Sequence, residues 1–182
     1  INNAENSAPV IKYGNHDFTR FESFLLDVWN KDIQFGLTCA FLMSKYIGQY
    51  MAKNGGGVIL NIASDLGIIA PDQRIYQKPG LLPEEQPVKP VTYSVVKHGL
   101  IGLTRYLATY WPDKNVRVNS ISPGGVYNDQ PNEFVAKLVK LIPLGRMADI
   151  EEYKAAILFL CSDASSYMTG ANLIIDGGRT CW

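Results

Sequence analysis

A tyrosine and a lysine four residues apart are the groups in this 182-residue chain best placed for proton chemistry. Tyr93 and Lys97 stand at positions i and i+4 of an apolar-periodic stretch. Such residues lie one above the other on one helix face. An ammonium beside a phenol favours the phenolate and lowers a pKa that is otherwise about 10. The pair predicts a proton donor and acceptor that works near neutral pH.

A serine upstream is the second candidate. Residues 58–63 form a short apolar run rich in β-branched side chains, between a glycine run and a turn, which is typical of a buried parallel strand. Ser64 stands just past the carboxyl end of this strand, where open α/β sheets bind ligands. We expect Ser64 to hydrogen-bond a substrate oxygen, and Asp65 and Gly125 to line the substrate site with it.

Helices and strands that position these residues are predicted in alternation along the chain. The stretch 1–4 has the pattern of a strand tail, and 6–18 is polar and interrupted by Pro9 and Gly14, so it is expected to be loop. Helices are expected over 21–53, 92–111, 131–142 and 150–161, the last capped by Asp149, and strands over 58–63, 116–121 and 172–175.

The connection 65–91 is unusually long and contains five prolines. Loops of this length in compact domains are usually functional or disordered. We expect an inserted flap on the substrate side. Arg74, Lys78 and Lys89 are candidates to meet a phosphorylated substrate, the alternative being ordinary solvated charge.

Composition limits the possible partners. The formal net charge is zero and 19% of residues are charged, which argues against nucleic acid or an anionic membrane. No apolar run is long enough for a membrane span, and no signal peptide is visible. Cys39, Cys161 and Cys181 lack C-x-x-C spacing, so we expect no metal site, with Cys39 and Cys161 in the core of a cytoplasmic protein.

Motifs in four places carry a family resemblance. They are Asn-Ile-Ala-Ser at 61–64, the stretch 92–97, Ser-Pro-Gly-Gly-Val at 122–126, and the segment 167–178 that ends in Asp-Gly-Gly. In this order and spacing they resemble the short-chain dehydrogenase/reductase family over nearly the whole chain. The opening Ile-Asn-Asn-Ala resembles a mid-chain motif of that family. The sequence therefore resembles the C-terminal two-thirds of such a protein: residues 1–182 as one domain, an incomplete Rossmann-type doubly wound parallel sheet of the α/β class.

The resemblance implies roles for particular residues. Ser64, Tyr93 and Lys97 are expected to be catalytic, and Lys97 also to hold the nicotinamide ribose of NAD or NADP. The helices 21–53 and 92–111 are expected to pack in a homodimer or homotetramer. The expected cofactor-binding residues are Asn3, Ala4, Tyr93, Lys97, Pro123, Gly124, Val126 and Asn128, the last standing where the family often has threonine.

Several positions depart from the family pattern. Gly36 aligns with the helical asparagine that anchors a proton-relay water, and Glu5 replaces a glycine. No G-x-x-x-G-x-G follows an early strand, and Gly55–Gly57 precedes a strand, which is the wrong context for cradling a pyrophosphate. We therefore expect these 182 residues alone not to turn over substrate.

The function that these patterns predict is hydride transfer between a secondary alcohol or ketone and a nicotinamide. The loop 124–128 and the ending 178–182 resemble those of dehydrogenases in bacterial surface-sugar and flagellin-glycan pathways, which suggests a sugar or nucleotide-sugar substrate. Two alternatives remain. One is a non-catalytic oligomerising or regulatory protein of the same fold, and the other is a sugar epimerase or dehydratase that uses the same Tyr/Lys pair.

Overall fold

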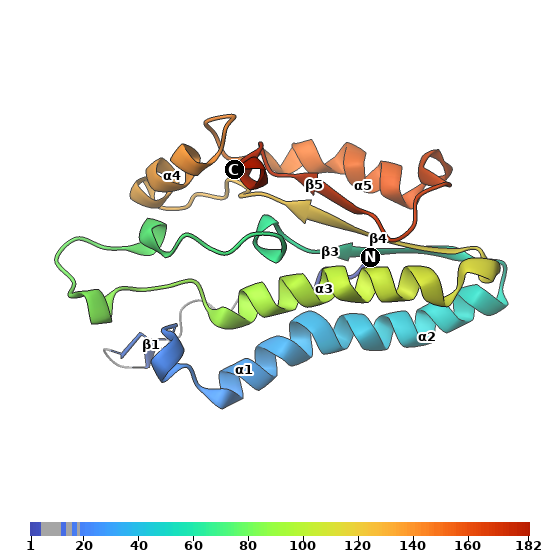
Figure 1. The fold of residues 1–182 in the computed structure, drawn as a ribbon, viewed down its shortest axis with the longest axis horizontal. Helices are drawn as coiled ribbons and strands as arrows, with labels where there is room; N and C mark the ends of the chain where they lie inside the picture. Colours follow the sequence, from blue (N-terminus) through green and yellow to red (C-terminus); the bar gives the residue numbers. More distant parts are fainter. Residues whose placement is uncertain (5–11, 14–15, 18) are drawn as a thin grey trace.

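The protein is a parallel β-sheet with helices on both faces (Figure 1). This computed structural model describes residues 1–4, 12–13, 16–17 and 19–182. The sheet consists of β3 (Gly57–Ile62), β4 (Val116–Pro123) and β5 (Asn172–Ile175), hydrogen-bonded in that order. Both pairings are parallel. The expected α/β class with a parallel sheet is confirmed.

Alternation along the strands fixes which helices cover each face of the sheet. Successive strand residues point to opposite faces. Ile59 and Val118 pack against the end of α3 (Val91–Tyr110), which carries Leu107. On the other face, Leu60 and Ile121 pack against α5 (Lys154–Cys161). A strand buried on both faces is expected to be largely apolar, as β3 is apart from the buried Asn61.

One long helical segment precedes β3 in the chain. It runs through α1 (Leu26–Ile33), a π-turn over Gln34–Thr38, and α2 (Cys39–Lys53). The helix expected over 21–53 therefore begins at Leu26, and it is α-helical except for the π-helical residues Gln34–Thr38. Many of its large apolar side chains are exposed, including Phe41, Tyr46 and Tyr50.

The first residues lie beside β3, as expected for a strand tail. Asn2 bridges to Asn61 in parallel, and its side-chain amide donates to the Asn61 Oδ1 at 2.8 Å. The loop expected over 6–18 lies largely outside the described residues, as does Glu5. Its described parts, β1 (Lys12–Tyr13) and β2 (His16–Asp17), form an antiparallel pair, so the loop assignment was wrong there.

The connection 65–91 contains short 3-10 turns and no strand. It lies against α4 (Asn132–Leu138), and its Ile75 shares an apolar cluster with Val139 and Leu141 of the 3-10 turn that follows, Val139–Leu141. Ile75 is buried with Leu138, Ile142 and Met147. A single apolar cluster therefore joins the connection to the helix expected over 131–142.

The C-terminal region starts at the expected cap. The Asp149 side chain accepts a hydrogen bond from the Glu151 amide at 2.8 Å, and the 3-10 turn Ile150–Tyr153 leads directly into α5. After β5, the chain ends in the 3-10 turn Arg179–Cys181.

The expectation of a core position for Cys161 was wrong, because this cysteine lies exposed at the end of α5, whereas Cys39 is half-buried. Among the described residues, no helix has the length and apolarity to cross a membrane.

Candidate functional site

The carboxyl ends of the parallel strands bring the candidate residues to one edge of the sheet. Ser64 follows β3, and Gly124 follows β4. The strand β4 extends past the expected end at Ile121, because Ser122 and Pro123 pair with Ile174 and Ile175 of β5. The loop after β4 therefore starts at Gly124, directly beside the end of β5.

Ser64, Tyr93 and Lys97 lie together at this edge. The Tyr93 hydroxyl is 3.3 Å from the Ser64 Oγ, and the Lys97 Nζ lies 5.5 Å from the centre of the Tyr93 ring. The lysine also donates to the carbonyl of Ile62, the last residue of β3, at 3.2 Å. Ser64 and Lys97 are buried, whereas Tyr93 is half-buried, so the phenol is the accessible member of the group.

A second lysine lies over the tyrosine ring. The Lys89 Nζ is 3.6 Å from the centre of the Tyr93 ring, within the range of a cation–π contact. Lys89 belongs to the long connection 65–91, which therefore reaches the site. The other two candidate cations, Arg74 and Lys78, have exposed side chains. Arg74 is paired with Asp72 at 2.7 Å.

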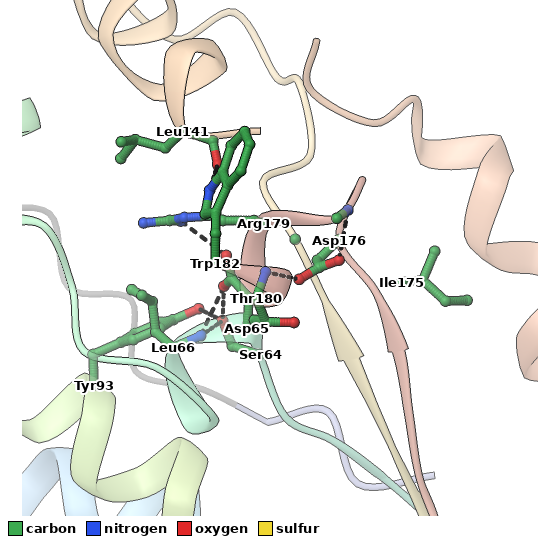
Figure 2. A network of polar contacts seen from close by, with 12 residues as sticks. Ser64, Asp65, Leu66, Tyr93, Leu141, Ile175, Asp176, Arg179, Thr180 and Trp182 are labelled. Atoms are coloured by element: carbon green, nitrogen blue, oxygen red, sulfur yellow. Dashed lines mark hydrogen bonds and ion pairs between the residues drawn. The ribbon is translucent and has the colours of Figure 1, made fainter. Parts of the chain in front are cut away.

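Asp65 is buried beside Ser64, and both of its carboxylate oxygens have partners. Oδ1 accepts from the Ser64 hydroxyl at 2.7 Å and from the Leu66 amide at 2.8 Å, and Oδ2 accepts from the Arg179 Nη1 at 2.8 Å. Figure 2 shows these groups as one network that continues to Tyr93. The sequence did not predict a role for Arg179.

The loop after β4 is packed tightly against the C-terminal turn. A Cβ on Gly124 would lie 2.7 Å from the Cα of Asp176, so only glycine fits. Beneath the loop, the Tyr153 hydroxyl is 3.3 Å from the carbonyl of Ile175, and burial raises the pKa of this tyrosine. A cavity of about 70 Å³ next to Gly124 is too small for a dinucleotide, since ligand pockets are typically about 300–1,000 Å³.

The other expected cofactor residues are spread along the same edge. Asn3 and Ala4 follow the bridge of Asn2 to β3 and are exposed. Val126 bridges to Ala148. Asn128 lies in an exposed turn, where its backbone amide donates to the Gln130 side chain at 2.7 Å.

Gly36 lies in the π-turn, against α3. A Cβ at this position would lie 2.5 Å from the Cγ1 of Val96, which is itself buried. The position that aligns with the family asparagine therefore has no room for a side chain. The glycine and the valine that fills its space are complementary.

Two residues of this neighbourhood were not assigned to it correctly from sequence. Arg179 was noted only as part of the C-terminal ending, and no local pattern links it to Asp65. Lys89 was considered for a phosphorylated substrate and not for contact with Tyr93. Lys89 is four residues before Tyr93, a spacing that would bring the two side chains together within a helix. The helix begins only after Pro90, so this spacing argument did not apply to Lys89.

Together, the parallel sheet and the Ser–Tyr–Lys group at its carboxyl edge define a class of α/β oxidoreductase. Residues 85–180 match the family described as "Enoyl-(Acyl carrier protein) reductase". The chain belongs to the short-chain dehydrogenase/reductase family.

Relatives of known sequence and structure agree with this membership. An uncharacterized oxidoreductase of Thermotoga maritima is 35% identical over 96% of this chain, and an NAD-dependent glycerol dehydrogenase of Listeria innocua is 38% identical over 85%. A crystal structure of a short-chain dehydrogenase from Leptospira borgpetersenii with bound NAD+ superposes on 89% of the chain with a TM-score of 0.81 and 36% identity. The chain spans 65%, 56% and 60% of these three proteins, respectively.

Proposed function

We propose that this chain carries the catalytic site of a nicotinamide-dependent dehydrogenase that interconverts a secondary alcohol and a ketone. The observation that carries the proposal is the convergence of Ser64, Tyr93 and Lys97 at the carboxyl edge of the sheet, with the tyrosine hydroxyl 3.3 Å from the serine oxygen. A hydroxyl bound between the two would contact an acid/base group and a hydrogen-bond donor at once.

Each residue has a distinct part in the proposed reaction. Tyr93 takes the proton of the substrate hydroxyl during oxidation and returns one during reduction. Ser64 hydrogen-bonds the same oxygen and stabilises the charge that develops on it. The ammonium of Lys97 favours the phenolate form of Tyr93 by its charge.

The residues present fit the nicotinamide end of NAD or NADP. The Lys97 ammonium at the end of β3 is a donor suited to ribose hydroxyls. The backbone at Gly124 and Gly125 starts the loop after β4 at the same edge of the sheet, where ligands of open α/β sheets bind. When bound, the cofactor would supply the hydride acceptor or donor. Asn3, Ala4, Pro123, Val126 and Asn128 remain the proposed further contacts.

The substrate class is proposed from the relatives and the site together. The similarity to a glycerol dehydrogenase favours a polyol or sugar hydroxyl. The long connection 65–91 is proposed as the substrate-side flap, since it packs against α4 through Ile75 and brings Lys89 over Tyr93.

Assembly and location follow from the same proposal. Apolar side chains on the outer face of α2, such as Phe41, Met43 and Tyr50, are roughly half exposed or more in the single chain. A patch of this kind marks an interaction surface. We propose that α2 and α3 pack against a second copy in a dimer or tetramer, and that the enzyme is cytoplasmic.

The test uses the complete gene product, because the chain spans only 56–65% of the length of the three relatives described above. Glycerol, a longer sugar alcohol and cyclohexanol are each incubated with NAD+ or NADP+, and nicotinamide absorbance is followed. Tyr93→Phe should lower kcat by about 10²–10⁴-fold, the usual contribution of a general acid/base. Tyr106→Phe is the matched control, because this tyrosine is on the same helix and mostly exposed.

Three other outcomes would contradict parts of the proposed function. Undiminished turnover by Tyr93→Phe would refute the acid/base assignment. Consumption of a sugar substrate without net change in nicotinamide absorbance would favour the epimerase or dehydratase. Turnover by the isolated 182-residue chain would refute our proposal that it is inactive alone.

A further inference from the structure

The C-terminal turn reaches back to the start of the catalytic site. Arg179 lies just after β5, yet its Nη1 donates to Asp65 Oδ2 at 2.8 Å, across 114 positions of sequence. Only 7% of the arginine side chain and 5% of the aspartate side chain are exposed. Figure 2 shows the pair beside Ser64. A buried carboxylate is costly unless it is paired and hydrogen-bonded, and this one is both.

The aspartate determines where the proton of Ser64 points. A serine hydroxyl has one proton to donate. A carboxylate can only accept, so the Ser64 hydroxyl donates to Asp65 at 2.7 Å. The Ser64 oxygen then accepts from the Tyr93 hydroxyl at 3.3 Å and from the Leu66 amide at 3.2 Å. One carboxylate oxygen therefore holds the serine in a single orientation beside the tyrosine.

We propose that Asp65 and Arg179 are a positioning pair for Ser64, an inference that rests on the proposed function. Arg179 fixes the carboxylate in one orientation and shares its negative charge. The carboxylate in turn holds Ser64 facing Tyr93. When a substrate oxygen arrives, the Ser64 hydroxyl turns its proton from Asp65 to that oxygen, and the ion pair with Arg179 keeps the carboxylate satisfied.

The turn that carries Arg179 is itself tightly built. The Asp176 carboxylate accepts from the Gly178 amide at 2.9 Å and from the Thr180 amide at 2.7 Å. Gly177 and Gly178 have φ values of 68° and 89°, a conformation that side-chain-bearing residues rarely adopt. Arg179 is therefore presented to Asp65 by a rigid turn.

Two further contacts connect this turn to the rest of the site. Asp176 lies against Gly124 of the loop after β4. Trp182 donates from its indole nitrogen to the carbonyl of Leu141, just after α4, at 3.3 Å. The ion pair thus stands where the Ser64 turn, the loop after β4 and the α4 region meet. Of these three, the Ser64 turn holds the direct partner of Arg179, because Asp65 accepts from the Ser64 hydroxyl.

The sequence predicted that Asp65 contacts the substrate. In the proposed pair, Asp65 instead positions Ser64. Both carboxylate oxygens are occupied by protein donors, and the residue is only 3% exposed. Within this proposal Asp65 acts on the substrate through Ser64.

The experiment is a mutant cycle in the complete gene product. Its substrate is whichever of the three alcohols of the activity test above (the panel) is oxidised fastest. Arg179→Gln should lower kcat on the order of 10- to 100-fold, because a reacting group displaced by about 1 Å can cost about 10²-fold. Arg179→Lys, which keeps the charge, should recover part of the loss. In a Ser64→Ala background, Arg179→Gln should change kcat by less than about twofold, because Arg179 then has no serine to position and residues in one hydrogen-bond network are not additive. Equal losses in both backgrounds would overturn the proposal.

Two further variants keep the result interpretable. If Arg179→Gln does not fold, the double variant Asp65→Asn with Arg179→Gln replaces it, because this variant leaves neither partner of the pair charged. It should show the same loss of kcat as expected for Arg179→Gln. In the Ser64→Ala background this loss should be absent. Arg146→Gln is the matched control: it breaks an arginine–carboxylate pair with Glu152 that is about half exposed and has no contact with Ser64. It should leave kcat unchanged.

Hydrogen exchange separates failure of this proposal from failure of the proposed function. The Leu66 amide donates to both Asp65 and Ser64, so its exchange should be faster in folded Arg179→Gln and unchanged in Arg146→Gln. Unchanged exchange in Arg179→Gln would refute the positioning pair whether or not any alcohol is oxidised. Faster exchange together with full activity of Tyr93→Phe would refute the proposed function and leave the positioning geometry in place.

Discussion

Gly36 offers a quantitative test of how closely the helices beneath the site are packed. The substitution is Gly36→Asn, which restores the residue type that the family carries at the aligned position. A Cβ built here lies 2.5 Å from Val96 Cγ1 and 3.1 Å from Cγ2. Carbon atoms in favourable contact are about 3.5–4.0 Å apart. The new atom must therefore displace the valine by about 1 Å.

The valine has little freedom to move away. Val96 is 4% exposed and lies in α3 between Tyr93 and Lys97. Its branched side chain has one strongly preferred rotamer in a helix. Overpacking of this kind costs about 1–3 kcal/mol. For a domain of this size that corresponds to a fall of roughly 2–12 °C in Tm, at about 2–4 °C per kcal/mol. We also expect kcat to fall, because Val96 lies on the helix between Tyr93 and Lys97, the proposed catalytic residues.

Thermal unfolding of the complete gene product measures this cost, and two variants make the assay specific. Gly102→Ala is the control, because a Cβ at Gly102 meets no atom within 4 Å; it should be neutral or stabilise by about 0.5–1 kcal/mol through helix propensity. Gly36→Asn combined with Val96→Ala should cost about 1 kcal/mol less than the sum of the single changes, since residues in contact are not additive. Additive losses, or a stable Gly36→Asn with raised activity, would refute the packing argument.

Two further predictions concern pH. The hydrogen bond from Arg146 lowers the pKa of Glu152 to about 2, so the stabilisation from this carboxylate is present above about pH 4.5 and is lost as pH falls toward 2. Glu152→Gln should therefore be less stable than the wild type at pH 7, with a gap in Tm that closes on acidification; a gap independent of pH would contradict this. Burial raises the pKa of Tyr76 to about 12, so the folded state favours the neutral phenol and loses stability as pH rises above 10. The Tyr76→Phe variant should therefore unfold at a higher pH than the wild type. At pH 11, one unit above the ordinary pKa of tyrosine, its free energy of unfolding should exceed that of the wild type by about 1.4 kcal/mol from this linkage. Equal midpoints of alkaline unfolding would show that the phenol is not buried in this way.

Local sequence was sufficient where the site depends on spacing within one element or on the end of a strand. Tyr93 and Lys97 are one helical turn apart, so any helix there brings them together. Ser64 follows the strand 57–62, and the edge at which parallel strands end is the same for all of them. These two arguments need no knowledge of distant parts of the chain.

Contacts across long separations could not be predicted in the same way. Arg179 and Asp65 are 114 residues apart, and nothing in either local pattern requires them to meet. The extension of β4 to Pro123 depends on pairing with β5, which periodicity within β4 does not contain. Cys161 occupies an apolar helical pattern but lies exposed, because α5 covers the sheet with only one face.

The central claim is that hydride passes directly between a substrate carbon and nicotinamide at the edge formed by Ser64, Tyr93 and Lys97. The most direct measurement is the mass of the reduced nicotinamide formed by the complete gene product from the panel alcohol oxidised fastest, deuterated at its carbinol carbon. We predict that the reduced cofactor carries the deuterium, and that Tyr93→Phe forms it at a rate lower by about 10²-fold or more. Reduced cofactor without deuterium, or labelled cofactor formed equally fast by Tyr93→Phe, would contradict this account.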